Sequence, residues 1–277
     1  MTTTVPPGIE AFEQYITWLE DEPTISLDGE YETYYDDVLA AALRTIETSD
    51  AWQTLAVALP DIDGTFRLNT GFPLMTETRT VPPLKKKPYR SFLEKTFRKN
   101  VLGNSQYPDP PAGGWILPNG WFTQIRDLIR TTFLVRYLDG VQVLAEAFAD
   151  HCDDGGIVHQ VDFEARDEGY YAAHFLADFD CEIPRLDWDT EIRTMTFEVH
   201  IATQIQGVLQ DLLHPQYEMR RLERGTDAVQ LWQWDYDSTE FKLNYLGHIS
   251  HYVDGMIVGL RNQPIGPTHE TGSRHEG

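Results

Sequence analysis

Cysteine is nearly absent from this sequence. The 277 residues include two, Cys152 and Cys181, and no CxxC pair. The first residues, MTTTVPPGIEAFEQY, have neither the basic stretch nor the apolar stretch of a secretory signal peptide. We therefore expect a reducing, cytoplasmic location and no disulfide framework.

Long apolar runs and basic residues are also scarce. No run approaches the roughly 20 residues that a membrane-spanning helix needs, so a membrane protein is not expected. The chain has 22 basic residues against 44 acidic ones, a formal charge of −22. This charge argues against broad, nonspecific binding to nucleic acid or anionic lipid, but it leaves room for a small basic pocket. Glycine-rich phosphate loops of the GxxxxGK and GxGxxG types are absent as well.

The basic residues that are present gather in one segment, KKKPYRSFLEKTFRK, at residues 85–99. Seven of its fifteen residues are Lys or Arg, and so dense a cluster in an acidic chain indicates a polyanionic ligand. The alternative is a solvated helix face that balances nearby acids. We expect a helix here that begins at Ser91, with Glu94 completing a capping box, and that stops at Gly103.

Hydrophobic periodicity predicts an α/β (α+β) fold with a mixed β-sheet of about five strands flanked by helices. Helical spacing covers residues 8–20, 31–59, 139–152, 204–223 and 239–262. Strands are expected at residues 64–69, 127–138, 156–165, 171–180 and 194–203, with a loop at 181–193. We divide the chain into an N-terminal helical region (1–80), a core (81–223), a C-terminal helical extension (224–263) and a disordered tail (264–277).

Two acidic residues stand out within the predicted sheet. Asp127 opens the first core strand, and Glu198 lies in the last one, where apolar residues alternate with Thr196, Glu198 and His200. A carboxylate on a sheet face is costly unless it is solvated, paired or bound to a metal. Two carboxylates on neighbouring strands, facing a basic helix, suit a Mg²⁺-nucleotide site. Ordinary solvent-facing acids are the alternative.

Four motifs occur in order across residues 85–217. The basic segment resembles the pattern R-x-K-x-x-x-S-x-x-x-K, and DLIRTTF resembles the strand opening D-[IL]-x-G-x-R. GYYAAH fits G-Y-x-x-x-H, and EVHIAT resembles E-[IV]-Q-I-R-T, with DLLHPQY continuing through His214 and Tyr217. Together they resemble the synthetase domain of the RelA/SpoT family, in its single-domain small alarmone synthetase or toxic small alarmone synthetase form. That family transfers pyrophosphate from ATP to the ribose 3′-hydroxyl of GDP or GTP.

The resemblance implies a nucleotidyltransferase-like fold and a role for each matched residue. ATP phosphates would be held by Lys85, Lys87, Ser91, Lys95 and Arg98. Asp127 and Glu198 would be catalytic and would bind the cofactor Mg²⁺, with Glu198 activating the attacking hydroxyl. The acceptor would be bound by Tyr170, His174 and His200. Gly169 would turn the chain so that Tyr170 forms a platform on which the guanine base stacks. The expected product is (p)ppGpp.

Several positions depart from the family pattern. The family glycine and arginine of the second motif are Arg130 and Thr132 here. In the fourth motif, His200 replaces a glutamine and Ala202 replaces an arginine. These changes leave the acceptor open, because toxin-type relatives act on the 3′ end of tRNA or on adenine nucleotides. Cations that could compensate for the lost arginines are Arg130, Arg136 and Arg193.

Other interpretations concern partners and the C-terminal helix. The altered arginines are also compatible with an inactive nucleotide-binding module. His248, His251 and Asp254 fit a metal site at helical spacing, although polar packing is the favoured interpretation. The same helix has an apolar stripe that would dock on the N-terminal helices or on a second subunit; it comprises Leu246, Ile249, Val253, Ile257 and Leu260. The protein partners expected are a second copy of this chain, in a homo-oligomer, or an antitoxin.

Overall fold

The structure is a computed structural model, and it describes residues 4–22, 27, 29–76, 81–118, 120–185, 189–212 and 232–263. Its helices include α1 (Phe12–Asp21), α2 (Gly29–Thr48), α3 (Asp50–Thr70), α4 (Tyr89–Phe97), α5 (Trp121–Gln124), α6 (Leu138–Asp154) and α8 (Thr239–Arg261). A π-helix, η1 (Arg98–Leu102), extends α4, and a 3-10 turn, η2 (Trp232–Trp234), precedes α8. A further helix begins at residue 204 and runs through residue 212. No helix in these ranges has the length and hydropathy needed to cross a bilayer.

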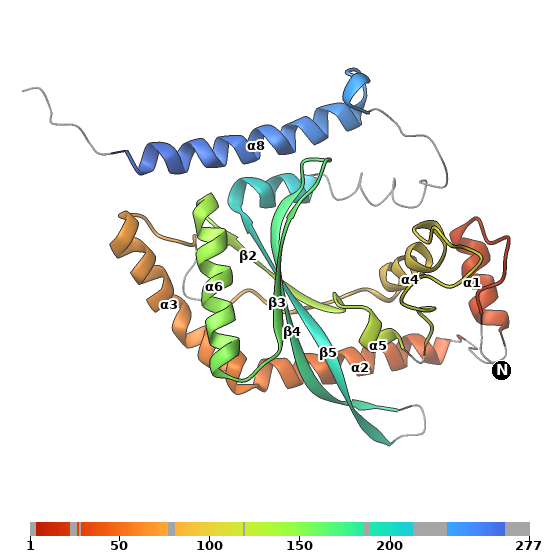
Figure 1. Cartoon of the computed structure of the whole chain (residues 1–277). Coiled ribbons are helices and arrows are strands. Elements are labelled where there is room, and N and C mark those ends of the chain that lie inside the picture. The colour runs from red at the N-terminus through yellow and green to blue at the C-terminus, as the bar shows by residue number, and fades with distance from the viewer. Residues whose placement is uncertain are drawn as a thin grey trace, which may run out of the picture.

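A mixed five-stranded sheet occupies the centre of the molecule (Figure 1). Its strands are β1 (Lys85–Lys86), β2 (Ile129–Val135), β3 (His159–Ala165), β4 (Tyr171–Pro184) and β5 (Thr190–Thr203). The order across the sheet is β1-β2-β5-β4-β3, with β2 and β5 parallel and the other neighbours antiparallel. The predicted mixed sheet of about five strands flanked by helices is therefore confirmed.

One face of the sheet forms the hydrophobic core because apolar residues alternate along the strands. Met195, Phe197, Val199 and Ile201 of β5 are buried, as the period of two predicts. Phe197 meets Trp52 of α3 edge-on, with ring centroids 5.4 Å apart. Phe148 of α6 makes similar edge contacts with rings on β2 and β4. The N-terminal helices thus share one core with the sheet, and the even-numbered residues of β5 occupy the opposite face.

Three local predictions were wrong. Residues 64–69 are the last turns of α3, because Leu59, Asp63 and Phe66 continue its buried face at helical spacing. Ser91 is not a cap: α4 begins at Tyr89, and Pro88, held extended after β1, takes the N-cap position. The loop expected at 181–193 is largely the end of a long β4–β5 hairpin.

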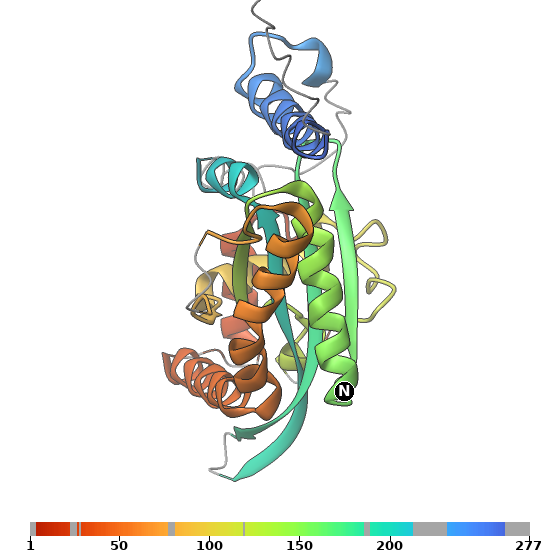
Figure 2. The same ribbon diagram turned by 90° about the vertical axis from the view of Figure 1, so that its left-hand side faces the viewer.

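The C-terminal helix packs with its small and polar face rather than its apolar stripe. Asn244, Gly247, Ser250 and Asp254 are buried, whereas Leu246, Ile249, Val253, Ile257 and Leu260 are 37–63% exposed. α8 lies across one end of the sheet beside α6, as both views show (Figures 1 and 2). At its C-terminal end, the guanidinium of Arg261 lies over the ring of Phe66 in α3.

The histidines of α8 serve packing. His248 hydrogen-bonds the Tyr171 hydroxyl at 2.8 Å, and His251 stacks on the same ring with centroids 3.7 Å apart. Asp254 accepts a 2.6 Å hydrogen bond from Thr203 Oγ1. Across the described ranges, no group of three or more His, Cys, Asp or Glu side chains is placed to hold a metal ion.

Candidate active site

Asp127 lies buried between two lysines that come from different elements. Lys87, directly after β1, is held in place by a backbone hydrogen bond from its N–H to Leu128 O at 2.8 Å. Its Nζ donates to Asp127 Oδ2 at 2.9 Å, and Lys95 Nζ of α4 lies 2.7 Å from Oδ1. The sequence prediction that Lys87, Lys95 and Asp127 share one site is thus consistent with their direct contact. Asp127 itself lies two residues before β2 rather than inside it.

The charges of this trio depend on one another. Burial would raise the pKa of Asp127, but the ammonium groups of Lys87 and Lys95 hold it well below the ordinary value. Burial also lowers the pKa of Lys87, and the Asp127 carboxylate opposes that change. Asp127 is therefore ionised at neutral pH, and one of its oxygens, Oδ1, has no aligned hydrogen-bond donor despite its proximity to Lys95.

Further cations surround the trio. The pKa of Lys99 is lowered by burial and then by the charge of Lys95, with Arg126 and Arg98 adding to the effect. Ser91 stands one helical turn before Lys95 on the same face of α4, as the i, i+4 spacing requires. Lys85 of β1 is paired in register with Arg130 of β2. These cations concentrate positive charge in one region of a chain whose net charge is −22.

A second cluster forms around Glu198 on the same face of the sheet. Glu198 Oε1 lies 3.4 Å from His174 Nδ1, and the ring of His174 faces that of His200 on the neighbouring strand. The Tyr170 hydroxyl lies 3.0 Å from Nε2 of both histidines. Because a hydroxyl has one proton, it donates to one imidazole and accepts from the other.

The environment of this cluster fixes the protonation of His200. Burial, followed by the charge of His174, lowers the pKa of His200 to about 4, so that this imidazole is neutral at pH 7. Gln210, on the helix after β5, lies 3.4 Å from the same ring. On the other side, the guanidinium of Arg166 lies over the Tyr170 ring, 5.0 Å from its centroid. One face of the predicted base platform is therefore covered by a cation.

Two residues beside these clusters were not among the site residues predicted from the sequence. Arg166 and Glu164 form an ion pair beside Tyr170 and His174. Glu164 could have been found from the alternation of side chains along β3. It lies two residues after Asp162, which is paired in register with His174, and therefore on the same face of the strand. Nothing in the sequence indicated that Arg166 covers Tyr170. His214 and Tyr217 lie outside the described residues.

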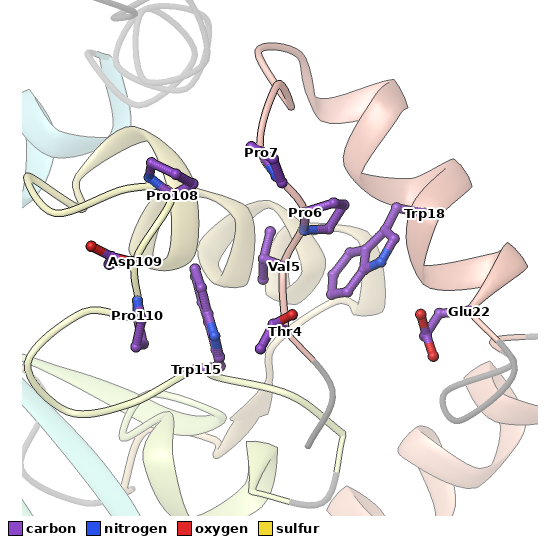
Figure 3. A pocket seen from close by; sticks show the side chains of 10 residues that line it. All are labelled: Thr4, Val5, Pro6, Pro7, Trp18, Glu22, Pro108, Asp109, Pro110 and Trp115. Atoms are coloured by element: carbon purple, nitrogen blue, oxygen red, sulfur yellow. The ribbon is translucent and has the colours of Figure 1, made fainter. Parts of the chain in front are cut away.

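A hollow elsewhere on the surface does not coincide with these residues. It lies between the N-terminal segment and the loop around Pro108, with Trp18 and Trp115 among the side chains that line it (Figure 3). None of the predicted site residues borders this hollow. The candidate active site is accordingly defined by its charges and contacts.

Comparison with known proteins bears on the fold. No protein-family model matches the sequence, and no curated protein is significantly similar to it. Small alarmone synthetase 1 from Bacillus subtilis superimposes with a TM-score of 0.52, at 14% identity, over 84% of this chain and 97% of that one. A GTP pyrophosphokinase family protein from Streptococcus pneumoniae gives a TM-score of 0.51, at 16% identity, over 85% and 94% of the two chains.

The chain has the fold of a small alarmone synthetase. The same Bacillus subtilis enzyme bound to its product pppGpp gives a TM-score of 0.52 at 13% identity, over 84% of this chain and 97% of that one. The resemblance found in the four motifs is thus confirmed at the level of the small alarmone synthetase fold.

Proposed function

We propose that this protein is an ATP-dependent pyrophosphokinase that transfers the β,γ-pyrophosphate of ATP to the 3′-hydroxyl of GDP or GTP. The observation that carries the proposal is the buried, ionised Asp127 between Lys87 and Lys95, with Lys99 and further cations nearby. ATP supplies the polyanion that such a group binds. The chain's fold, shared with proteins described as alarmone synthetases and GTP pyrophosphokinases, supports the same proposal.

Each residue of the site has a separate role in the proposed reaction. The lysines and Arg98 bind and orient the phosphates of ATP, and their charge offsets the negative charge of the triphosphate. Glu198 accepts the proton of the acceptor hydroxyl, whose oxygen forms a bond to the β-phosphorus. The bond between the β-phosphorus and the oxygen bridging to the α-phosphate breaks, and AMP leaves. His174, in contact with Glu198, orients that carboxylate.

The residues present fit a magnesium ion. Asp127 and Glu198 would provide hard oxygen ligands, and Oδ1 of Asp127 has no aligned hydrogen-bond donor, although it lies 2.7 Å from Lys95 Nζ. Bound Mg²⁺ would supply charge neutralisation at the phosphate oxygens. Lys95 would then exchange its contact with Asp127 for one with a phosphate.

The acceptor is proposed from the cluster around Tyr170. The guanidinium of Arg166 lies 5.0 Å from the centroid of the Tyr170 ring, and we propose that a guanine base stacks on the same ring system when the acceptor binds. The neutral His200 offers a ring nitrogen as hydrogen-bonding partner in place of the family glutamine. An acceptor at the tRNA 3′ end or an adenine nucleotide is the alternative, because neither Thr132 nor Ala202 can provide the family's arginine charge.

The test is a transfer assay with γ-labelled ATP and Mg²⁺, with GDP, GTP, ADP and bulk tRNA offered separately. Label on a guanosine nucleotide, lost in Glu198→Gln, supports the proposal. Glu191→Gln, a carboxylate at the far end of β5, is the matched control and should retain activity. Label on tRNA or ADP overturns the proposed acceptor but keeps the reaction. Absence of transfer to any acceptor by the folded protein overturns the proposed activity and favours a nucleotide-binding module.

A further inference from the structure

Arg130 occupies a central place in a row of side chains that crosses the sheet. In the strand register, Lys85 of β1 is paired with Arg130 of β2, and Arg130 is paired with Glu198 of β5. Residues paired in register project from the same face of a sheet. Arg130 therefore lies between Lys85 on one side and, on the other, Glu198, whose carboxylate is proposed to receive the acceptor proton.

Arg130 is half-buried but makes no side-chain hydrogen bond or ion pair with any described residue. Other arginines of the chain are neutralised by carboxylates, as Arg193 is by Glu191 and Arg261 by Asp139. Glu198 is the nearest acid in register, yet it contacts His174 instead. Removing a guanidinium from water without a counter-charge is unfavourable, so its presence at this position indicates an anionic ligand.

The positive charge of Arg130 acts on residues in both clusters of the site. It opposes protonation of both Lys87, in the Asp127 trio, and His200, in the Tyr170 cluster. Arg130 is thus within electrostatic reach of both halves of the site. The other two arginines that the sequence offered as substitutes lie elsewhere. Arg193 is in the β4–β5 hairpin and forms an ion pair with Glu191, and Arg136 lies just beyond the opposite end of β2.

We propose that Arg130 is a catalytic residue that binds the non-bridging oxygens of the pyrophosphoryl group while it moves from ATP to the acceptor. This inference rests on the proposed function and assigns the charge that Thr132 and Ala202 no longer provide. Thr132 is one step along the same face of β2, and Ala202 is buried. Arg130 supplies two adjacent N–H donors to the group that carries negative charge throughout the transfer, in a position next to Glu198.

The first test compares Arg130→Ala and Arg130→Lys with wild-type protein, with Arg136→Ala, just beyond the other end of β2, as the matched control. Arg130→Ala should lower kcat by about 10²-fold or more, with a smaller change in the KM for ATP. Arg130→Lys should recover part of the loss, and added guanidinium ion should partly restore Arg130→Ala. Arg136→Ala should behave as wild type. A kcat for Arg130→Ala within about threefold of wild type would overturn the inference.

The second test separates this inference from the proposed function. Because Arg130 makes no side-chain hydrogen bond or ion pair with any residue that the structure describes, Arg130→Ala should fold and keep the thermal midpoint of the wild type. Calorimetric titration with inorganic pyrophosphate, without any acceptor, should show about tenfold weaker binding in Arg130→Ala, and no loss in Arg136→Ala. If the wild type shows no transferase activity and Arg130→Ala binds pyrophosphate more weakly, the anion-binding role of Arg130 is supported and the proposed function is not. Unchanged pyrophosphate affinity would overturn the role of Arg130 whether or not the wild type transfers pyrophosphate.

Discussion

Gly169, in the turn between β3 and β4, packs backbone against backbone with Gly247 in the middle of α8. A β-carbon on Gly247 would collide with the carbonyl of Gly169, and one on Gly169 would collide with the carbonyl of Asn244. Gly169 also has a φ of +78°, which other residues rarely adopt. The turn that presents Tyr170 is therefore fixed both by its own backbone and by the helix that crosses it.

Gly247→Ala should destabilise the protein by about 1–3 kcal/mol, because the added methyl group forces α8 away from the turn. Urea unfolding monitored by circular dichroism would measure the change. Gly259→Ala is the control in the same helix, since its β-carbon meets nothing within 4 Å; it should be neutral or slightly stabilising. Equal stabilities of the two variants would show that the contact does not hold α8 in place.

Asp127→Ala should destabilise the protein by about 3–5 kcal/mol, because it leaves the buried Lys87 without a counter-charge. Lys95→Ala should cost less, since the Lys95 side chain is 23% exposed and that of Lys87 is 9% exposed. The double variant Lys87→Met/Asp127→Leu should recover most of the loss. Chemical denaturation of the four proteins provides the comparison, and a loss for Lys95→Ala as large as that for Asp127→Ala would contradict it.

Stability should rise with pH between about 4 and 6.5 because of His200. The pKa of this residue is about 4 in the folded protein and about 6.5 when exposed, so the unfolded chain binds more protons in this window. The contribution is on the order of 1–3 kcal/mol and is lost on acidification. In His200→Gln, denaturation midpoints measured from pH 4.5 to 7 should depend less on pH than in the wild type. If the two proteins show the same pH dependence, another group is responsible for it.

Neither cysteine should react with a thiol reagent while the protein is folded. Cys181 is fully buried and Cys152 is 8% exposed, and burial raises the pKa of each thiol to about 11. With Ellman's reagent at pH 8, the native protein should show less than one rapidly reacting thiol, and the protein in denaturant should show two. Rapid native reaction would indicate local opening of α6 or β4.

The elements that could be predicted from sequence are those whose signal is local. The alternation around Glu198 specified which face of β5 is buried, and the continuous helical spacing of α6 predicted its extent to within a few residues. The four motifs predicted Lys87 and Lys95 as ATP ligands, Asp127 as a metal ligand and His174 as an acceptor contact, and these roles stay predictions. Predictions failed where a local pattern was compatible with two structures. Residues 64–69 were predicted as a strand and belong to α3, and residues 181–193 were predicted as a loop and largely form the end of the β4–β5 hairpin.

The sequence by itself determined the alternation of the strands, the basic segment and the spacing of the motif residues, because each depends on neighbours along the chain. The tertiary structure decided that Lys87 pairs with Asp127 across 40 positions, that α8 packs through its glycine and polar face, and that Arg130 lies in register with Glu198. These outcomes depend on strand order and register, which bring distant residues within a few ångströms. No local periodicity encodes such distances, so charge pairing and burial in the site emerge only when the sheet is assembled.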